Sequence, residues 1–245
     1  MCIKSLALVA SGLLALGLTC ARADTEPEHG FVDRVYKSPD GEECKYVLFV
    51  PHDYQGDKPY PLILSLHGDG EKGTDGKRPS LKGLGAAVHK QEKTFPFLTL
   101  FPQGRKSGWS ADSEDGRRVM AILADVEHDY GVDPKRVYVT GMSSGGDGVW
   151  SFAARYPERW AAIVPVCGNG DPKDAGKIKD VPCWYFMGGA DNKAWVDNAR
   201  EMVKALREAG GSPTYTEYPG MGHGIWGKTY GTQELFDWLL KQHRE

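Results

Sequence analysis

The chain has 245 residues, of which 40% are hydrophobic and 26% charged, and its formal net charge is −3 at pH 7. This length is enough to bury a sizeable core. No proline-rich linker, internal repeat or low-complexity tract divides the chain, which favours one domain over residues 24–245. The weakly acidic balance, without a basic stripe, argues against nucleic-acid binding.

The beginning of the chain predicts a secretory signal peptide. Lys4 precedes an apolar run over residues 6–18, and residues 21–23 form the small-x-small pattern of a cleavage site. The run is shorter than the roughly 20 residues that span a bilayer, so we expect an exported protein, cleaved after Ala23, with no membrane span. A lipoprotein anchored through Cys20 is the less favoured alternative, because the residue before this cysteine is a bulky threonine.

The remaining chain alternates strand patterns with helix patterns. Eight strands are expected at residues 31–36, 45–50, 62–66, 97–101, 136–140, 161–166, 183–187 and 214–218. Helices are expected at residues 81–91, 116–130, 144–156, 196–209 and 232–243. This alternation predicts an α/β fold with a mostly parallel sheet covered by helices on both faces. A Pro-Asp-Gly turn after the first strand predicts an antiparallel pair at one edge.

A Gly-x-Ser-x-Gly motif occupies residues 141–145, between a predicted strand and a predicted helix. In this motif the serine lies on a tight turn, and the two glycines fill positions where the backbone passes too close for a side chain. A chance match in a structural turn is the alternative. The flanking strand and helix favour Ser143 as a nucleophile, and Ser144 does not fit because its preceding glycine position is Met142.

A serine hydroxyl needs a base and a group that orients the base. On a sheet of this type the chain order is serine, acid, histidine, and only His223 and His243 follow Ser143. His223 lies in a glycine-rich loop after the last strand, whereas His243 lies near the end of the last helix. His223 is therefore the predicted base.

The acid should follow a strand at the same sheet edge as the serine. Asp191 comes directly after the strand at residues 183–187, through a short Gly-Gly-Ala loop. Asp197 is the second candidate, although its helical setting suggests a helix N-terminal stabiliser instead. We expect Asp191 to orient the base.

Backbone amides should stabilise the negative charge on the substrate's carbonyl oxygen. One is expected from Ser144, the residue after the nucleophile, and the other from Asp69, in the loop after the third strand. The carboxylate of Asp69 would repel an oxyanion and must point away or be neutralised. His67 is expected to pack beneath this loop.

The chain has no evident metal or cofactor site. Cys44, Cys167 and Cys183 lack the spacing of a zinc site and are too few for a disulfide scaffold. We expect buried thiols, and no cofactor or metal in the reaction.

These motifs resemble the secreted esterase branch of the alpha/beta-hydrolase superfamily, near the poly(3-hydroxybutyrate) depolymerase-like, feruloyl-esterase-like and phospholipase/carboxylesterase groups. The resemblance is carried by residues 61–73, 133–146, 153–160, 167–172 and 222–226. It implies Ser143 as nucleophile, His223 as base, Asp191 as acid, and the amides of Asp69 and Ser144 as oxyanion donors. Relatives usually have methionine at the position of Ser144 and an aromatic residue at that of Asp147.

No long insertion is available to form a large lid, so we expect an open cleft with Trp226 and Trp109 as candidate walls. The predicted function is a secreted, metal-free serine carboxylesterase acting on small acyl or aryl esters, or on feruloyl or acetyl esters of polysaccharide. Two alternatives remain. The same triad could serve a small serine peptidase of the prolyl-oligopeptidase type, or the chain could be a non-catalytic carbohydrate-binding relative.

Overall fold

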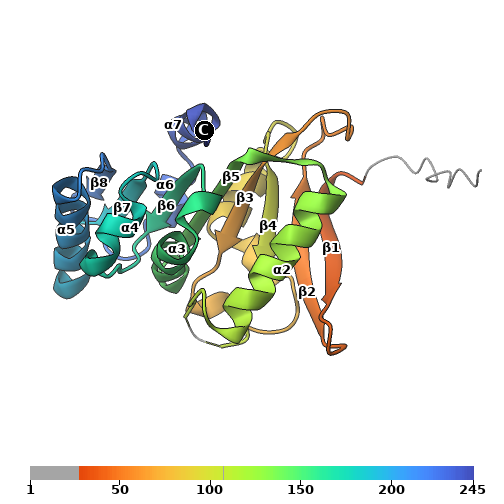
Figure 1. The fold of residues 1–245 in the computed structure, drawn as a ribbon, viewed down its shortest axis with the longest axis horizontal. Coiled ribbons are helices and arrows are strands. Elements are labelled where there is room, and N and C mark those ends of the chain that lie inside the picture. Colours follow the sequence, from red (N-terminus) through yellow and green to blue (C-terminus); the bar gives the residue numbers. More distant parts are fainter. Residues whose placement is uncertain (1–27, 107) are drawn as a thin grey trace, which may run out of the picture.

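A single eight-stranded sheet runs through the part of the chain that the structure describes. The computed structural model describes residues 28–106 and 108–245, so the predicted signal peptide and Cys20 lie outside the described residues. The strand order is β1-β2-β4-β3-β5-β6-β7-β8 (Figure 1). The strands are β1 (Gly30–Lys37), β2 (Glu43–Val50), β3 (Tyr60–Leu66), β4 (Leu98–Pro102), β5 (Val132–Met142), β6 (Ala162–Val166), β7 (Trp184–Gly188) and β8 (Thr214–Tyr218).

The strand directions confirm the predicted mixed sheet. β1 pairs antiparallel with β2, and β2 pairs antiparallel with β4, whereas every other neighbouring pair is parallel. All the residues of β3 are buried, and β3 lies between β4 and β5 near the middle of the sheet. A strand buried on both faces is expected where helices cover both faces of a parallel sheet.

The helices are α1 (Leu84–Lys90), α2 (Glu114–Asp129), α3 (Ser144–Arg155), α4 (Ala175–Ile178), α5 (Lys193–Glu208), α6 (Trp226–Thr229) and α7 (Gln233–Lys241). Helix α2 crosses in front of the strands in Figure 1, and α3 lies beside it. Successive residues of a strand face opposite sides. Tyr138 and Thr140 point to the same face of β5, opposite to the one covered by α3. Tyr138 donates a hydrogen bond to the carbonyl oxygen of Gln242, directly after α7, and Thr140 bonds to the hydroxyl of Tyr230, directly after α6. Helices therefore cover both faces, as predicted.

Two features differ from the sequence-based expectation. β5 begins at Val132, because this residue pairs with Tyr60 of β3 before a shift in register. Helices α4 and α6 have only four residues each, too few for the helical periodicity on which the prediction rests. Between β6 and β7, a stretch that the structure describes throughout, the chain forms only the 3-10 helix Pro172–Asp174 and α4, and it builds no large lid.

Among the described residues, no helix has the length and apolar character needed to cross a bilayer.

Candidate active site

Ser143 lies on the turn between β5 and α3, in a backbone conformation that side chains rarely adopt. Its φ is 55°, in the left-handed region that costs a non-glycine residue free energy. The flanking glycines allow this turn. A Cβ atom on Gly141 would lie 2.3 Å from the carbonyl oxygen of Gly145, and one on Gly145 would lie 2.1 Å from that of Leu66. The turn holds the serine side chain above the carboxyl ends of the central strands.

The three predicted side chains of the triad meet at this edge of the sheet. The hydroxyl of Ser143 lies 2.8 Å from Nε2 of His223, and Nδ1 of the same ring lies 2.7 Å from Oδ2 of Asp191. A carboxylate can only accept, so Nδ1 carries the proton and Nε2 is free to accept from the serine hydroxyl. This is the arrangement that nucleophilic catalysis by serine requires.

The loops that carry Asp191 and His223 are joined by backbone hydrogen bonds. The amides of Gly189 and Ala190 donate to the carbonyl oxygens of Tyr218 and Met221, at 2.9 and 2.8 Å. A Cβ atom on Gly188 would lie 2.2 Å from the carbonyl oxygen of Gly222, so this close approach requires glycine.

The second candidate acid lies elsewhere. The carboxylate of Asp197 pairs with Lys193 at 2.5 Å on the exposed side of α5. Of the two carboxylates that the sequence offered after β7, the structure brings Asp191 to the imidazole.

The two predicted oxyanion donors both stand at the start of a helix. Asp69 begins the 3-10 helix Asp69–Glu71, and Ser144 begins α3. The first amides of a helix have no acceptor within that helix, so such amides are available to a ligand. The carboxylate of Asp69 accepts a hydrogen bond from the amide of Gly108 at 3.1 Å. Its negative charge is therefore bound by the loop between β4 and α2.

His67 supports this loop from below, as expected. Its Nε2 accepts from the amide of Gly104 at 2.9 Å, so Nδ1 carries the proton and donates to the carbonyl oxygen of Gly68 at 2.6 Å. Burial lowers the pKa of His67. The neutral ring thus fixes the backbone beside the predicted oxyanion donor Asp69.

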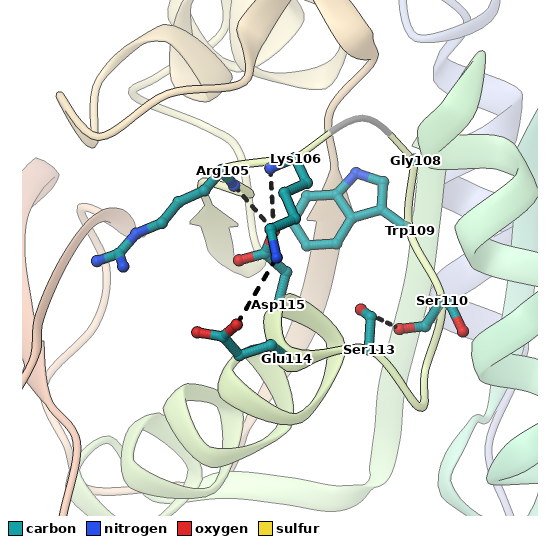
Figure 2. A pocket seen from close by; sticks show the side chains of 8 residues that line it. All are labelled: Arg105, Lys106, Gly108, Trp109, Ser110, Ser113, Glu114 and Asp115. Atoms are coloured by element: carbon teal, nitrogen blue, oxygen red, sulfur yellow. Dashed lines mark hydrogen bonds and ion pairs between the residues drawn. The ribbon is translucent and has the colours of Figure 1, made fainter. Parts of the chain in front are cut away.

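Trp109, a predicted wall of the cleft, lies largely in the core. It is 6% exposed, and its indole N–H donates to the carbonyl oxygen of His67 at 2.9 Å. Its ring borders a pocket of about 530 Å³ beside the loop between β4 and α2 (Figure 2), which no triad residue lines. This placement favours a packing role over contact with substrate.

Cys167 lies behind the triad, a neighbour that the sequence did not reveal. Its thiol donates to the carbonyl oxygen of His223 at 3.3 Å, and burial raises its pKa to about 12. Possible ligand atoms of Cys167, Asp191 and His223 lie within 4.8 Å of one another. Each of these groups already has a hydrogen-bond partner inside the site, so a metal ion would have to break the contact between Asp191 and His223. All three cysteines predicted to be buried thiols are buried and free.

Asp147 lies one helical turn after the nucleophile and is partly buried. Its carboxylate accepts from the amide of Asn169 at 2.5 Å. Burial, the largest influence, raises the pKa of Asp147, and the charge of Asp69 acts in the same direction, while the Asn169 amide and His223 oppose it. Asp147 and Asp69 therefore place two carboxyl groups near Ser143, close enough for the charge of one to act on the other.

Two tryptophan rings lie against the imidazole. The centroid of the Trp226 ring, a predicted wall of the cleft, is 5.7 Å from that of His223. Trp195 is closer, at 4.8 Å, and sequence reasoning missed it. Its position four residues after Asp191, at the start of a helix, was the signal that could have found it.

The comparisons with known proteins agree with this fold. A model of the dienelactone hydrolase family matches residues 46–231. The "Probable feruloyl esterase C" of Aspergillus oryzae is 29% identical over 204 residues, which cover 78% of this chain and 70% of that protein. A "Bifunctional acetylxylan esterase/xylanase" of Neocallimastix patriciarum is 24% identical over 191 residues, covering 75% of this chain and 27% of that protein.

A solved structure gives the same result. The crystal structure of a thermostable esterase superposes with a TM-score of 0.78 and 36% sequence identity, over 87% of this chain and 63% of that chain. This chain thus spans less than two thirds of that esterase. Because the family model covers most of the sequence, the chain belongs to the dienelactone hydrolase family of α/β-hydrolases, and it is a hydrolase that acts on esters.

Proposed function

We propose that the protein is a serine carboxylesterase that forms an acyl-enzyme on Ser143. The observation that supports this most is the continuous hydrogen-bonded chain from Asp191 through His223 to the serine hydroxyl. The imidazole takes the serine proton as the hydroxyl attacks the ester carbon, and it returns this proton to the departing alcohol. Asp191 stabilises the imidazolium that forms in between.

The developing oxyanion accepts hydrogen bonds from the amides of Asp69 and Ser144 in this proposal. Ser144 opens the 12-residue helix α3, so its amide also carries the partial positive charge of a helix N-terminus. Asp69 opens a 3-10 helix of only three residues, so its amide acts as a hydrogen-bond donor alone. A water molecule, activated by the same imidazole, then releases the acid and restores Ser143. No step in this sequence calls for a metal ion or cofactor.

The proposed substrates are feruloyl or acetyl esters carried on polysaccharide. The names of the relatives, a feruloyl esterase and an acetylxylan esterase, support this choice. We further propose that residues 24–245 form one catalytic unit, exported after removal of the segment that ends at Ala23.

An activated aryl ester tests the nucleophile. Wild-type protein should release a burst of the phenol followed by slower steady turnover. A fluorophosphonate should phosphonylate Ser143 with loss of fluoride, so that the peptide containing Ser143 gains the mass of the phosphonyl group. Ser143→Ala should lower kcat by roughly 10⁴- to 10⁶-fold, and Asp191→Asn by about 10⁴-fold, because the wrong tautomer of the base results. Turnover by Ser143→Ala at the wild-type rate would overturn the assignment.

The substrate class is tested separately. Release of ferulate and of acetate from arabinoxylan should exceed the cleavage of matched amides by several orders of magnitude. Faster cleavage of the amides would favour a peptidase instead.

A further inference from the structure

Trp195 stands out among the exposed side chains because it touches the proposed catalytic base. It is 37% exposed, and its ring centroid lies 4.8 Å from that of His223, with an angle of 53° between the planes. The other large hydrophobic side chains that are exposed in the described part of the chain are aliphatic: Val35, Leu81 and Leu240. An indole open to solvent beside an active-site imidazole offers a ligand a flat apolar face and a polar N–H.

The position of this ring is fixed by the same segment that holds the catalytic acid. Asn192 caps α5 by accepting the amide of Ala194 at 2.9 Å, and the amide of Trp195 donates to the carbonyl oxygen of Asn192 at 2.9 Å. Trp226 starts α6, directly after the loop that carries His223, and its ring meets the imidazole nearly edge to face, at 87°. The two indoles and the imidazole therefore form one aromatic surface.

The chemistry of the reaction determines which half of the ester reaches this surface. The imidazole must protonate the departing alcohol, so the oxygen of that alcohol comes within hydrogen-bond reach of Nε2 of His223. The carbonyl oxygen points to the amides of Asp69 and Ser144 instead. Groups that line the exposed side of the imidazole thus meet the alcohol half of the substrate.

We propose that Trp195, with Trp226, forms a subsite for the alcohol half of the ester, and that its ligand is a carbohydrate ring. A sugar has a flat face of C–H groups, which packs on an indole, and a rim of hydroxyl groups. Asn192, exposed three residues before Trp195, caps α5 through its side-chain oxygen, and its amide NH₂ group is a polar donor suited to such a rim. A simple aliphatic alcohol would gain more from an enclosed apolar pocket.

This inference rests on the proposed function, because it assumes that His223 protonates the leaving alcohol. The test must separate this subsite from a second role for Trp195, which is to shield the hydrogen bond between Asp191 and His223. The side chain of Asp191 is only 5% exposed, and the nearby indole could merely shield its hydrogen bond to His223. A shielding role affects every substrate equally and changes the pH profile, whereas a subsite affects only substrates with a sugar.

The test uses one acyl group esterified to two alcohols, methanol and an arabinose or xylose unit. Trp195→Ala should lower kcat/KM on the sugar ester by about 10-fold, mainly through KM, and leave the methyl ester within about twofold. The deacylation rate should not change, because the alcohol has already left. Trp195→Phe, which keeps an aromatic face, should retain most of the preference for the sugar.

Leu240→Ala, at another exposed hydrophobic side chain, is the matched control and should change neither ester. An equal loss on both esters with a shifted pH profile, or no loss on either, would overturn the subsite. Failure of the proposed function would look different, since the Ser143→Ala variant would then hydrolyse the methyl ester at the wild-type rate.

Discussion

At the scale of single residues, Asp147 links the active site to stability. A carboxyl group whose pKa is higher in the folded than in the unfolded state binds its proton more tightly when folded. Burial produces this direction of shift in Asp147. The stability contribution of the protonated group is therefore fully present in acid and is lost as the pH rises through the folded-state pKa. At neutral pH the ionised Asp147 opposes folding.

We expect Asp147→Asn to raise the melting temperature at pH 7. The asparagine oxygen can still accept from the amide of Asn169, while the cost of burying a charge disappears. The advantage should shrink as the pH falls toward about 4, the ordinary pKa of an aspartate, because a carboxyl group with a raised pKa regains its proton at a higher pH than usual. Thermal melts at both pH values measure this. Asp57→Asn, at an exposed loop position, is the control, and an advantage of Asp147→Asn that persisted unchanged into acid would contradict the argument.

At the scale of elements, the junction of β5 with α3 depends on close backbone contact. Gly145→Ala should destabilise the protein by about 3 kcal/mol or more, because its Cβ atom would meet the carbonyl oxygen of Leu66 at 2.1 Å. Activity should fall as well, since β3 and the serine turn would have to separate. Denaturant unfolding and ester turnover measure the two effects.

Gly176→Ala is the matched control for this substitution. Gly176 lies in α4, is exposed, and has open space within 4 Å of the point where a Cβ atom would lie. Alanine there should be neutral or stabilising by about 0.4–1 kcal/mol, because it restricts the unfolded chain. Equal stability of the two variants would contradict the role given to Gly145.

The same junction explains how much of the site could be predicted. The spacing of Gly141 and Gly145 around Ser143 is a local requirement, so it is visible in the sequence. Asp191 and His223 follow strands of one parallel sheet, and such strand ends meet at one edge. Topology alone thus places both side chains near Ser143, and the distances in the structure agree.

What could not be predicted depends on contacts between distant segments. Trp109 was expected at the cleft, but its indole N–H finds an acceptor at His67, far away in sequence, and the ring is buried with it. The local composition around Trp195 does not mark it, and its place four residues after Asp191 is the one hint in the sequence. Its contact with His223 exists only once two loops are joined. Pairwise contacts of this kind leave no trace in local composition.

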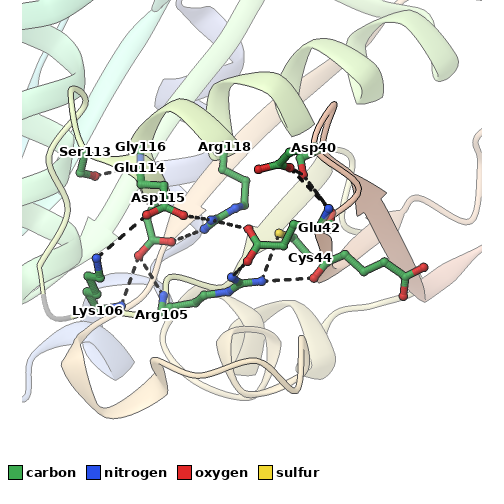
Figure 3. A network of polar contacts seen from close by, with 12 residues as sticks. Asp40, Glu42, Cys44, Arg105, Lys106, Ser113, Glu114, Asp115, Gly116 and Arg118 are labelled. Atoms are coloured by element: carbon green, nitrogen blue, oxygen red, sulfur yellow. Dashed lines mark hydrogen bonds and ion pairs between the residues drawn. The ribbon is translucent and has the colours of Figure 1, made fainter.

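At the scale of the whole molecule, a charged network joins the edge hairpin to the helical layer. The side chain of Arg118, on α2, is 7% exposed and pairs with Asp115, with Glu114 at 2.8 Å and with Glu42 at 3.0 Å (Figure 3). Asp115 also accepts the amide of Arg105 at 2.9 Å. The network therefore ties the turn between β1 and β2 to α2 and to the loop that reaches the active site.

Arg118→Ala should lower the free energy of unfolding by about 3–5 kcal/mol, because it leaves the buried carboxylate of Asp115 without its charged partner. The midpoint of urea unfolding measures the loss. Arg155→Ala, which breaks an exposed ion pair with Asp112, should leave that midpoint within experimental error. Since the loop after β4 also holds Asp69 through Gly108, Arg118→Ala should lower kcat on the aryl ester as well. If Arg118→Ala were no more harmful to stability than Arg155→Ala, the hairpin and α2 would be held together by packing rather than by charge.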